Sequence, residues 1–150
     1  MQRSRRALVA VGLLAVGLQL SACTQQAAEA EGGGAAEPAK VEQVEGADVS
    51  RLTLTARAAE RLGVQTKPLL AGKIGGTSRR VVPYSAVLYD AKGDTWVYAN
   101  PAPLTYVRER VTVDYIEGDQ AVLTDGPPEG TPVVTVGAAE LYGTEFGVGH

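Results

Sequence analysis

Turn-forming residues recur at short intervals along the C-terminal half of this chain and divide it into short segments. Glycine, proline, asparagine and aspartate favour tight turns, and proline and glycine also interrupt helices. The segments between the turns are rich in valine, threonine and tyrosine, which favour strands. A long helix has no room here, so this half predicts β structure. The turns are Asp90–Asp94, Asn100–Pro103, Glu117–Asp119 and Asp125–Gly130.

The region before these turns predicts one short helix. Thr55 can cap a helix over Ala56–Leu62, because its hydroxyl can accept from a free amide, and Gly63 is a natural stop. Ala71–Ser78 contains three glycines and predicts a loop. Strands are expected at Arg51–Thr55, Val64–Lys67, Val81–Tyr89, Thr95–Ala99, Leu104–Ile116, Gln120–Thr124 and Pro132–Val136. The fold class is therefore mainly β: a small β-barrel or β-roll of six to seven short strands with one short helix, after a disordered linker.

Residues 1–22 have the three parts of a secretory signal peptide. Arg3, Arg5 and Arg6 form a basic start, Ala7–Leu20 is a largely apolar run, and small residues follow. That run has about fourteen residues, fewer than the ~20 that a membrane-spanning helix needs. We therefore expect the segment to be removed after export.

The order Leu20-Ser21-Ala22-Cys23 resembles the lipobox of bacterial lipoproteins, whose cysteine receives a diacylglycerol and becomes the first mature residue. The resemblance implies a covalent lipid on Cys23, no other cofactor, and a protein anchored to the cell membrane on its extracytoplasmic side. Each buried methylene of such a lipid contributes ~0.8 kcal/mol to membrane binding. The alternative is an ordinary signal peptide with an incidental cysteine. Cys23 is the only cysteine, so no intramolecular disulfide is possible.

Residues 23–49 predict a flexible, acidic tether. The segment has no aromatic residue, contains three consecutive glycines, and cannot bury enough apolar surface to offset its ordering entropy. The folded domain is expected at residues 50–150, with 143–150 as a loose, glycine-rich tail pinned by Tyr142. The alternative is that Tyr142 and Phe146 are offered to a partner. The acidic residues of the tether are Glu29, Glu31, Glu37, Glu42, Glu45 and Asp48, and its single basic residue is Lys40.

Composition excludes several classes of function. The chain has 14 basic and 17 acidic residues, whereas a nucleic-acid-binding protein calls for a basic face. His150 is the only histidine and the last residue, which disfavours a catalytic histidine pair. No clustered histidines or cysteines predict a metal site. The acidic turns Asp90–Asp94 and Glu117–Asp119 could hold calcium weakly, although solvated hairpin turns explain them better. The sequence thus predicts a protein that is not an enzyme.

Two regions resemble the membrane-proximal domain of periplasmic adaptor subunits (membrane fusion proteins) of RND-type efflux transporters. In the first, Leu52–Thr55, a short helix and Gly63–Leu69 match the family's strand, helix and "LGIxTxPV" pattern. In the second, Val82–Leu88 matches "VPxSAV", Gly93–Tyr98 the glycine turn and aromatic strand, and Gly126–Val134 the closing turn and strand, without its usual leucine. The family's β-barrel, lipoyl-like and helical-hairpin domains normally separate the two regions. Here only Leu70–Val81 connects them.

The resemblance implies a non-enzymatic, adaptor-like subunit that docks on the outward face of an inner-membrane transporter. Because the long hairpin is absent, this chain is not expected to bridge a cell envelope. Tryptophan, tyrosine and arginine are common interface anchors, although aromatics in a small β domain are more often core. The candidate docking residues, expected to be exposed, are Arg79, Arg80, Tyr84, Trp96, Tyr98, Arg108 and Arg110.

An alternative function is a cell-surface lipoprotein that binds a small ligand or a cell-wall polymer through a β-barrel face. Trp96 and Tyr98 would then stack on sugar rings, although their alternation along one short strand suits packing equally well. A transporter permease encoded beside this gene would favour the adaptor over the surface-binding alternative.

Overall fold

The structure is a computed structural model that describes residues 37–147. The predicted signal peptide 1–22, the lipobox with Cys23, the tether up to residue 36 and His150 lie outside the described residues. Those assignments stay predictions. Within residues 37–147 no helix is long and apolar enough to cross a membrane.

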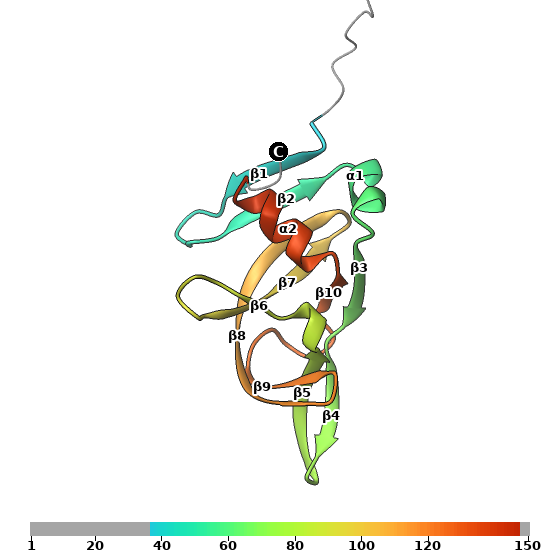
Figure 1. The fold of residues 1–150 in the computed structure, drawn as a ribbon, viewed down its shortest axis with the longest axis vertical. Helices are drawn as coiled ribbons and strands as arrows, with labels where there is room; N and C mark the ends of the chain where they lie inside the picture. The colour runs from blue at the N-terminus through green and yellow to red at the C-terminus, as the bar shows by residue number, and fades with distance from the viewer. Residues whose placement is uncertain (1–36, 148–150) are drawn as a thin grey trace, which may run out of the picture. The chain divides into compact units, whose positions relative to one another are not determined.

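The described part is mainly β, as predicted, with ten strands in one sheet (Figure 1). Two α-helices and a short 3-10 helix accompany it: α1 (Ala56–Arg61), α2 (Ala138–Glu145) and η1 (Tyr84–Ala86). The strands are β1 (Ala39–Gln43), β2 (Ser50–Leu54), β3 (Gln65–Pro68), β4 (Leu70–Ile74), β5 (Thr77–Pro83), β6 (Leu88–Tyr89), β7 (Thr95–Ala102), β8 (Thr105–Glu117), β9 (Gln120–Asp125) and β10 (Pro132–Val136).

The sheet curls into a small, barrel-like roll. Its main path runs β3-β10-β7-β8-β9-β5-β4, so β3 and β4 lie at opposite ends of the path. Yet Leu69 alone separates these two strands in sequence, which is possible only if the sheet curls until its ends meet. Leu69 fixes this closure: its amide donates to the Thr131 carbonyl at 2.8 Å, and its carbonyl accepts from the Gly130 amide at 2.9 Å.

The long strand β8 connects the two halves of the roll. Its first residues pair with β2 and β7, and its last residues pair with β9. Register shifts between Thr112 and Tyr115 bend it, as β-bulges do. The prediction of one long strand over 104–116 is therefore confirmed.

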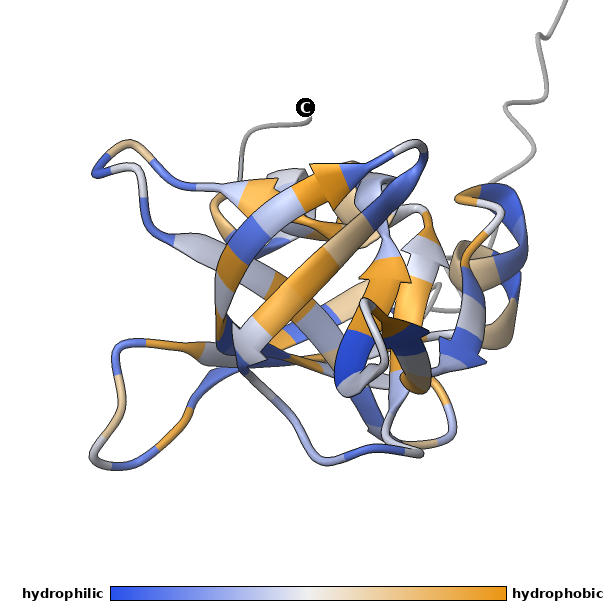
Figure 2. Cartoon of the chain, turned by 90° about the horizontal axis from the view of Figure 1, so that it is seen from below, coloured by the Kyte–Doolittle hydropathy of each residue, from blue (hydrophilic) through white to orange (hydrophobic). Residues whose placement is uncertain are grey.

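Both faces of the central strands are buried. Val97 and Val133 pack into one apolar cluster inside the roll, whereas their neighbours Tyr98 and Val134 pack into a second cluster beneath α1 and α2. Successive strand residues point to opposite faces, so burial on both faces requires a continuous apolar run. Figure 2 shows the strands from below, with hydrophobic residues in orange and hydrophilic residues in blue.

The helix α1 follows its sequence signals. The Thr55 hydroxyl accepts from the Ala58 amide at 3.2 Å, and Gly63 adopts the left-handed conformation that ends the helix. Ala58 and Ala59 turn into the core. The predicted helix over 56–62 is thus confirmed to within one residue.

The predicted loop over 71–78 is wrong, because these residues form the β4–β5 hairpin. Gly75 and Gly76 both have positive φ, at 58° and 81°, which is the geometry of a two-residue turn that matches strand twist. The predicted strand over 81–89 is interrupted: Pro83 ends β5, and η1 separates it from β6.

The folded domain begins before residue 50, so the predicted end of the tether at 49 is wrong. Residues 39–43 form β1, which pairs along its whole length with β2. Gln43 also closes the connecting turn, since its side-chain amide donates to the Ala47 carbonyl at 2.8 Å. The acidic composition of the predicted tether is compatible with a strand here, because β1 lies at the surface and most of its side chains stay in water.

The predicted loose tail over 143–150 is wrong for residues 143–147, because α2 runs to Glu145. Gly137 starts this helix with φ +88°, and a Cβ there would meet Val64 at 3.1 Å. Ala138 and Leu141 are buried in the second cluster. Burial of this face holds the helix despite Gly143 within it.

Candidate interaction site

Four predicted docking residues meet on one face of the β7–β8 pair. Trp96 lies opposite Arg110 in the register, and Tyr98 lies opposite Arg108. The α2 helix covers part of this face with Tyr142, Glu145 and the following Phe146. We call these seven residues the arginine–aromatic cluster.

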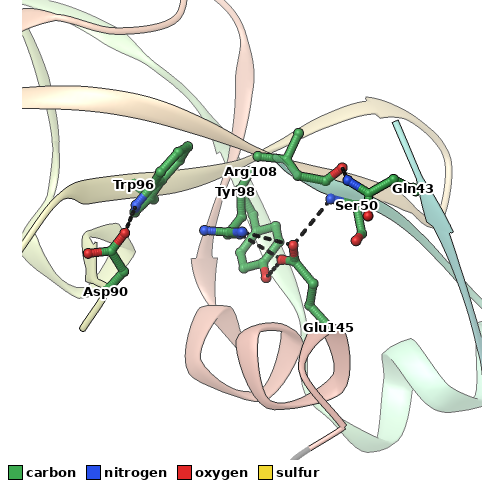
Figure 3. Close-up of polar contacts among 8 residues, drawn as sticks. Gln43, Ser50, Asp90, Trp96, Tyr98, Arg108 and Glu145 are labelled. Carbon is green, nitrogen blue, oxygen red and sulfur yellow. Dashed lines mark hydrogen bonds and ion pairs between the residues drawn. The ribbon is translucent and has the colours of Figure 1, made fainter. Parts of the chain in front are cut away.

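The inner half of the arginine–aromatic cluster is a buried ion pair (Figure 3). Arg108 donates from Nε and Nη2 to the two Glu145 carboxylate oxygens at 2.7 and 3.0 Å. Their side chains are only 5% and 2% exposed. The Tyr98 hydroxyl and the Ser50 amide also donate to Glu145, at 2.5 and 3.2 Å. Four hydrogen bonds thus satisfy a carboxylate that burial alone would make costly.

Three aromatic rings surround the Arg108 guanidinium. Its central carbon lies 4.7 Å from the ring centre of Trp96, 5.1 Å from Phe146 and 5.6 Å from Tyr142. Tyr142 and Phe146 also contact each other, with ring centres 4.6 Å apart. Cation–π attraction strengthens when water is excluded, so these rings help to hold the buried charge.

The outer half of the cluster faces water. Arg110 pairs with Asp94 through two hydrogen bonds of 2.7 Å, and its side chain is 59% exposed. This carboxylate raises the pKa of Arg110. The Trp96 indole donates to Asp90 at 3.1 Å. Desolvation raises the pKa of Asp90, but this indole bond and the amides of Asp94 and Lys92 outweigh it, so the pKa is lowered.

The expectation that all seven docking residues are exposed is wrong for four of them: two are buried, and Trp96 and Arg80 are only partly exposed. Tyr98 is fully buried and Arg108 is 6% exposed. Both lie under α2, where the sequence predicted only a tail. Trp96 is partly buried, while Arg110 and Phe146 are exposed. The signal for α2 was present, because Ala138, Leu141, Tyr142 and Glu145 have the i, i+3, i+4, i+7 spacing of a helix face.

The other three predicted docking residues lie apart from the cluster. Tyr84 begins η1 and is exposed, and Arg79 is exposed on β5. Arg80 instead turns onto the β9–β10 loop. Its guanidinium donates to the carbonyls of Thr124, Gly126 and Pro127. Arg80 is thus a structural residue of the loop.

Replacing Arg80 by methionine is expected to destabilise the domain by about 1–3 kcal/mol, because three loop carbonyls lose a charged donor. The neighbouring Arg79→Met is the matched control and should change stability by less than about 0.5 kcal/mol, since Arg79 is exposed. Urea denaturation of the two variants measures the difference. Equal stability would show that the loop does not depend on Arg80.

Alkaline pH is expected to destabilise the domain through Tyr98. Burial, together with the hydrogen bond to Glu145, raises the pKa of Tyr98 above its ordinary value near 10. Below that ordinary pKa the phenol is neutral in both states, and its stabilisation is fully present. Above it only the unfolded chain ionises, so stability falls by about 1.4 kcal/mol per pH unit for each such tyrosine. Tyr98→Phe should reduce the slope between pH 10 and 11; an unchanged slope would contradict the burial.

The geometry does not favour sugar stacking on Trp96 and Tyr98. Tyr98 has no exposed face, and two guanidinium groups lie within 4.9 Å of the Trp96 ring centre. An open groove of about 1040 Å³ between β1, α1 and α2 has Phe146 as its one aromatic lining residue. Along residues 37–147 no group of three or more His, Cys, Asp or Glu side chains gathers.

Comparisons with known proteins give one similar structure. No protein-family model matches the chain, and no curated protein matches it. The similar structure is an NMR structure of a 180-residue piece of SilB from Cupriavidus metallidurans CH34, which holds the N-terminal metal-binding site and the membrane-proximal domain. The identity is 24% and the TM-score 0.45, over 56% of this chain and 48% of that chain. The match therefore spans about half of that 180-residue piece.

Proposed function

We propose that this protein is a non-enzymatic, adaptor-like accessory subunit that docks on the extracytoplasmic face of a membrane transporter of the efflux class. A lipid on Cys23 anchors it to the membrane. Its folded domain supplies the contact with the transporter, and it carries no cofactor beyond that lipid.

The observation that carries the proposal is that the two adaptor-like sequence regions fold together. The first region supplies β2 and β3, and the second supplies β10 and encloses β8 in sequence. β2 pairs with β8, and β3 pairs with β10, so each strand of the first region completes a ladder of the second. Such long-range pairing is what one membrane-proximal domain, interrupted in sequence by other domains, requires.

The position of the missing domains also supports the proposal. The β4–β5 hairpin stands between the two regions, where the family carries its barrel, lipoyl-like and helical domains. Within it, five residue pairs from Leu70↔Val81 to Ile74↔Thr77 close the gap. A chain closed in this way keeps the part that faces the transporter and lacks the part that reaches an outer channel.

The tether gives the lipid anchor a mechanical role. A docking surface on a single small domain binds weakly, because few residues contribute. Confinement at the membrane raises the effective concentration of such a weak binder. Anchoring at Cys23, a short distance before β1, would hold the domain within reach of a transporter in the same membrane.

Replacing Cys23 by alanine, with export retained through an ordinary cleavage site, is expected to leave the domain folded and to abolish its function. The measurement is complementation of a deletion strain at native expression, with resistance to exported toxic compounds as the readout. Folding is checked by circular dichroism of the released protein. If the soluble form restores resistance fully, the anchor is only an address and its role in docking is refuted.

A further inference from the structure

A group of exposed aromatic and aliphatic side chains lies away from the arginine–aromatic cluster. Tyr84, Tyr89, Tyr115 and Ile116 are 45%, 53%, 41% and 40% exposed. We call these four residues the tyrosine patch. Three of the chain's six tyrosines are therefore exposed at the surface, so packing in the core is not the reason for a tyrosine at these positions.

The four residues lie close together. Tyr89, Tyr115 and Ile116 line the same open hollow of about 500 Å³ between the β6–β7 hairpin and the outer half of β8. Tyr84 extends this surface, because its phenol lies near that of Tyr89 and raises the pKa of Tyr89. The Tyr84 amide also donates to the Asp119 carbonyl at 2.7 Å, which places η1 beside the β8–β9 turn.

Acidic residues lie beside the tyrosine patch. Asp114 and Glu117 flank Tyr115 and Ile116 in sequence, and Asp119 lies beside Tyr84 through the turn. All three are exposed, and within residues 37–147 none of them is in an ion pair. Asp94 also lines the hollow, but Arg110 neutralises it. The charge around the patch is therefore negative and uncompensated.

We infer that the tyrosine patch is the docking surface for the partner and that the partner meets it with a basic polypeptide segment that carries apolar side chains. Tyrosines supply large contact area with few rotatable bonds, as interface anchors do. The uncompensated rim selects a cationic partner and repels an anionic bilayer. This inference rests on the proposed function. It places the docking surface at the tyrosine patch with its acidic neighbours, and not at the predicted arginines.

A second copy of this chain is the competing occupant. No acidic residue occurs between Glu60 and Asp90, and Lys73 and Arg79 project on the β4–β5 hairpin. A head-to-tail contact of that hairpin with an acidic tyrosine patch would also satisfy the charges. The test must therefore separate a transporter from a second copy.

Photo-crosslinking in whole cells makes this separation with the full, lipidated chain. The photoreactive p-benzoylphenylalanine is placed at Tyr115, and in a control strain at Leu70, which is 58% exposed on β4. We expect a transporter permease to be crosslinked from position 115 and not from position 70. Crosslinks from 115 to a second copy alone would overturn the inference.

Two further changes, made with the probe at 115, test the chemistry. Tyr89→Ala should reduce the crosslink yield about tenfold, as loss of one interface anchor does. Val136→Ala, at a site 47% exposed on β10, should not. Asp114→Asn with Glu117→Gln should reduce the yield and its sensitivity to salt, whereas the exposed Glu129→Gln should change neither.

The outcomes separate the inference from the proposed function. If a permease is captured from position 70 but not 115, or if Tyr89→Ala and Val136→Ala have equal effects, the inference fails while the proposed function stands. If neither position captures a permease and general crosslinking finds none, the proposed function fails with it.

Discussion

Replacing Glu145 by alanine is expected to destabilise the domain by about 3–5 kcal/mol, because it leaves the buried Arg108 charge without its partner. The Arg108 side chain is 5% exposed, so water cannot replace the lost carboxylate. The Tyr98 hydroxyl and the Ser50 amide lose an acceptor at the same time. Urea denaturation measures the loss of stability. It can be followed by the fluorescence of Trp96, which is the single tryptophan and a member of the cluster.

Two further variants show whether the ion pair is the cause. Glu140→Ala, on an exposed position of the same helix, should change stability by less than about 0.5 kcal/mol. The double change Arg108→Met with Glu145→Met removes both charges and should recover much of the loss, as for other buried pairs. If Glu145→Ala is as stable as the wild type, the pair is not buried in solution and the assignment of α2 to this face is wrong.

Replacing Leu141 by alanine is expected to cost about 2–5 kcal/mol, the usual range for a fully buried leucine. Leu141 has no exposed surface, and it packs in the cluster that contains Leu52, Tyr98 and Val134. The truncation leaves a cavity between α2 and the sheet. The measurement is again the urea midpoint of the mature chain.

The matched control for Leu141 is Ala139→Ser, which is exposed two residues earlier on the same helix. It should change the free energy of unfolding by less than about 0.5 kcal/mol. A Leu141→Ala variant that unfolds with the wild type would mean that the C-terminal segment is a loose tail after all, as its glycines predict.

Local signals predicted the elements whose structure depends on neighbouring residues. The Thr55 cap and the Gly63 stop define α1, and alternating residues define most of β8. The Asp90 carboxylate accepts from the Lys92 and Asp94 amides, so the predicted turn there closes within five residues. The β4–β5 hairpin belonged to the same class, and its two consecutive glycines were a readable signal.

The elements that local signals did not predict depend on contacts between residues far apart in sequence. β1 is a strand because β2 pairs with it, whereas the acidic, glycine-containing composition of the predicted tether as a whole favours a flexible chain. Glu145 belongs to the cluster because it lies over Arg108, 37 residues away. The same covering helix decides which of the predicted docking residues reach the surface. Composition could nominate tyrosine and arginine as interface residues, but it could not show which of them α2 buries.

These corrections move the proposed contact to a different surface. Tyr98 and Arg108 hold the domain together, and Arg80 holds the β9–β10 loop. Arg110 pairs with Asp94 and lies over the Trp96 ring, and the Trp96 indole donates to Asp90. Among the predicted docking residues, Tyr84 stays exposed within a larger apolar surface, beside Tyr89.

The most direct test of the proposed function is chemical crosslinking of the full chain in whole cells, followed by mass spectrometry of what it is joined to. We expect a transporter permease as the main protein partner, and we expect that partner to be lost when Cys23→Ala releases the domain from the membrane. Recovery of cell-wall polymer with no transporter subunit, from cells that express the protein at its native level, would contradict it.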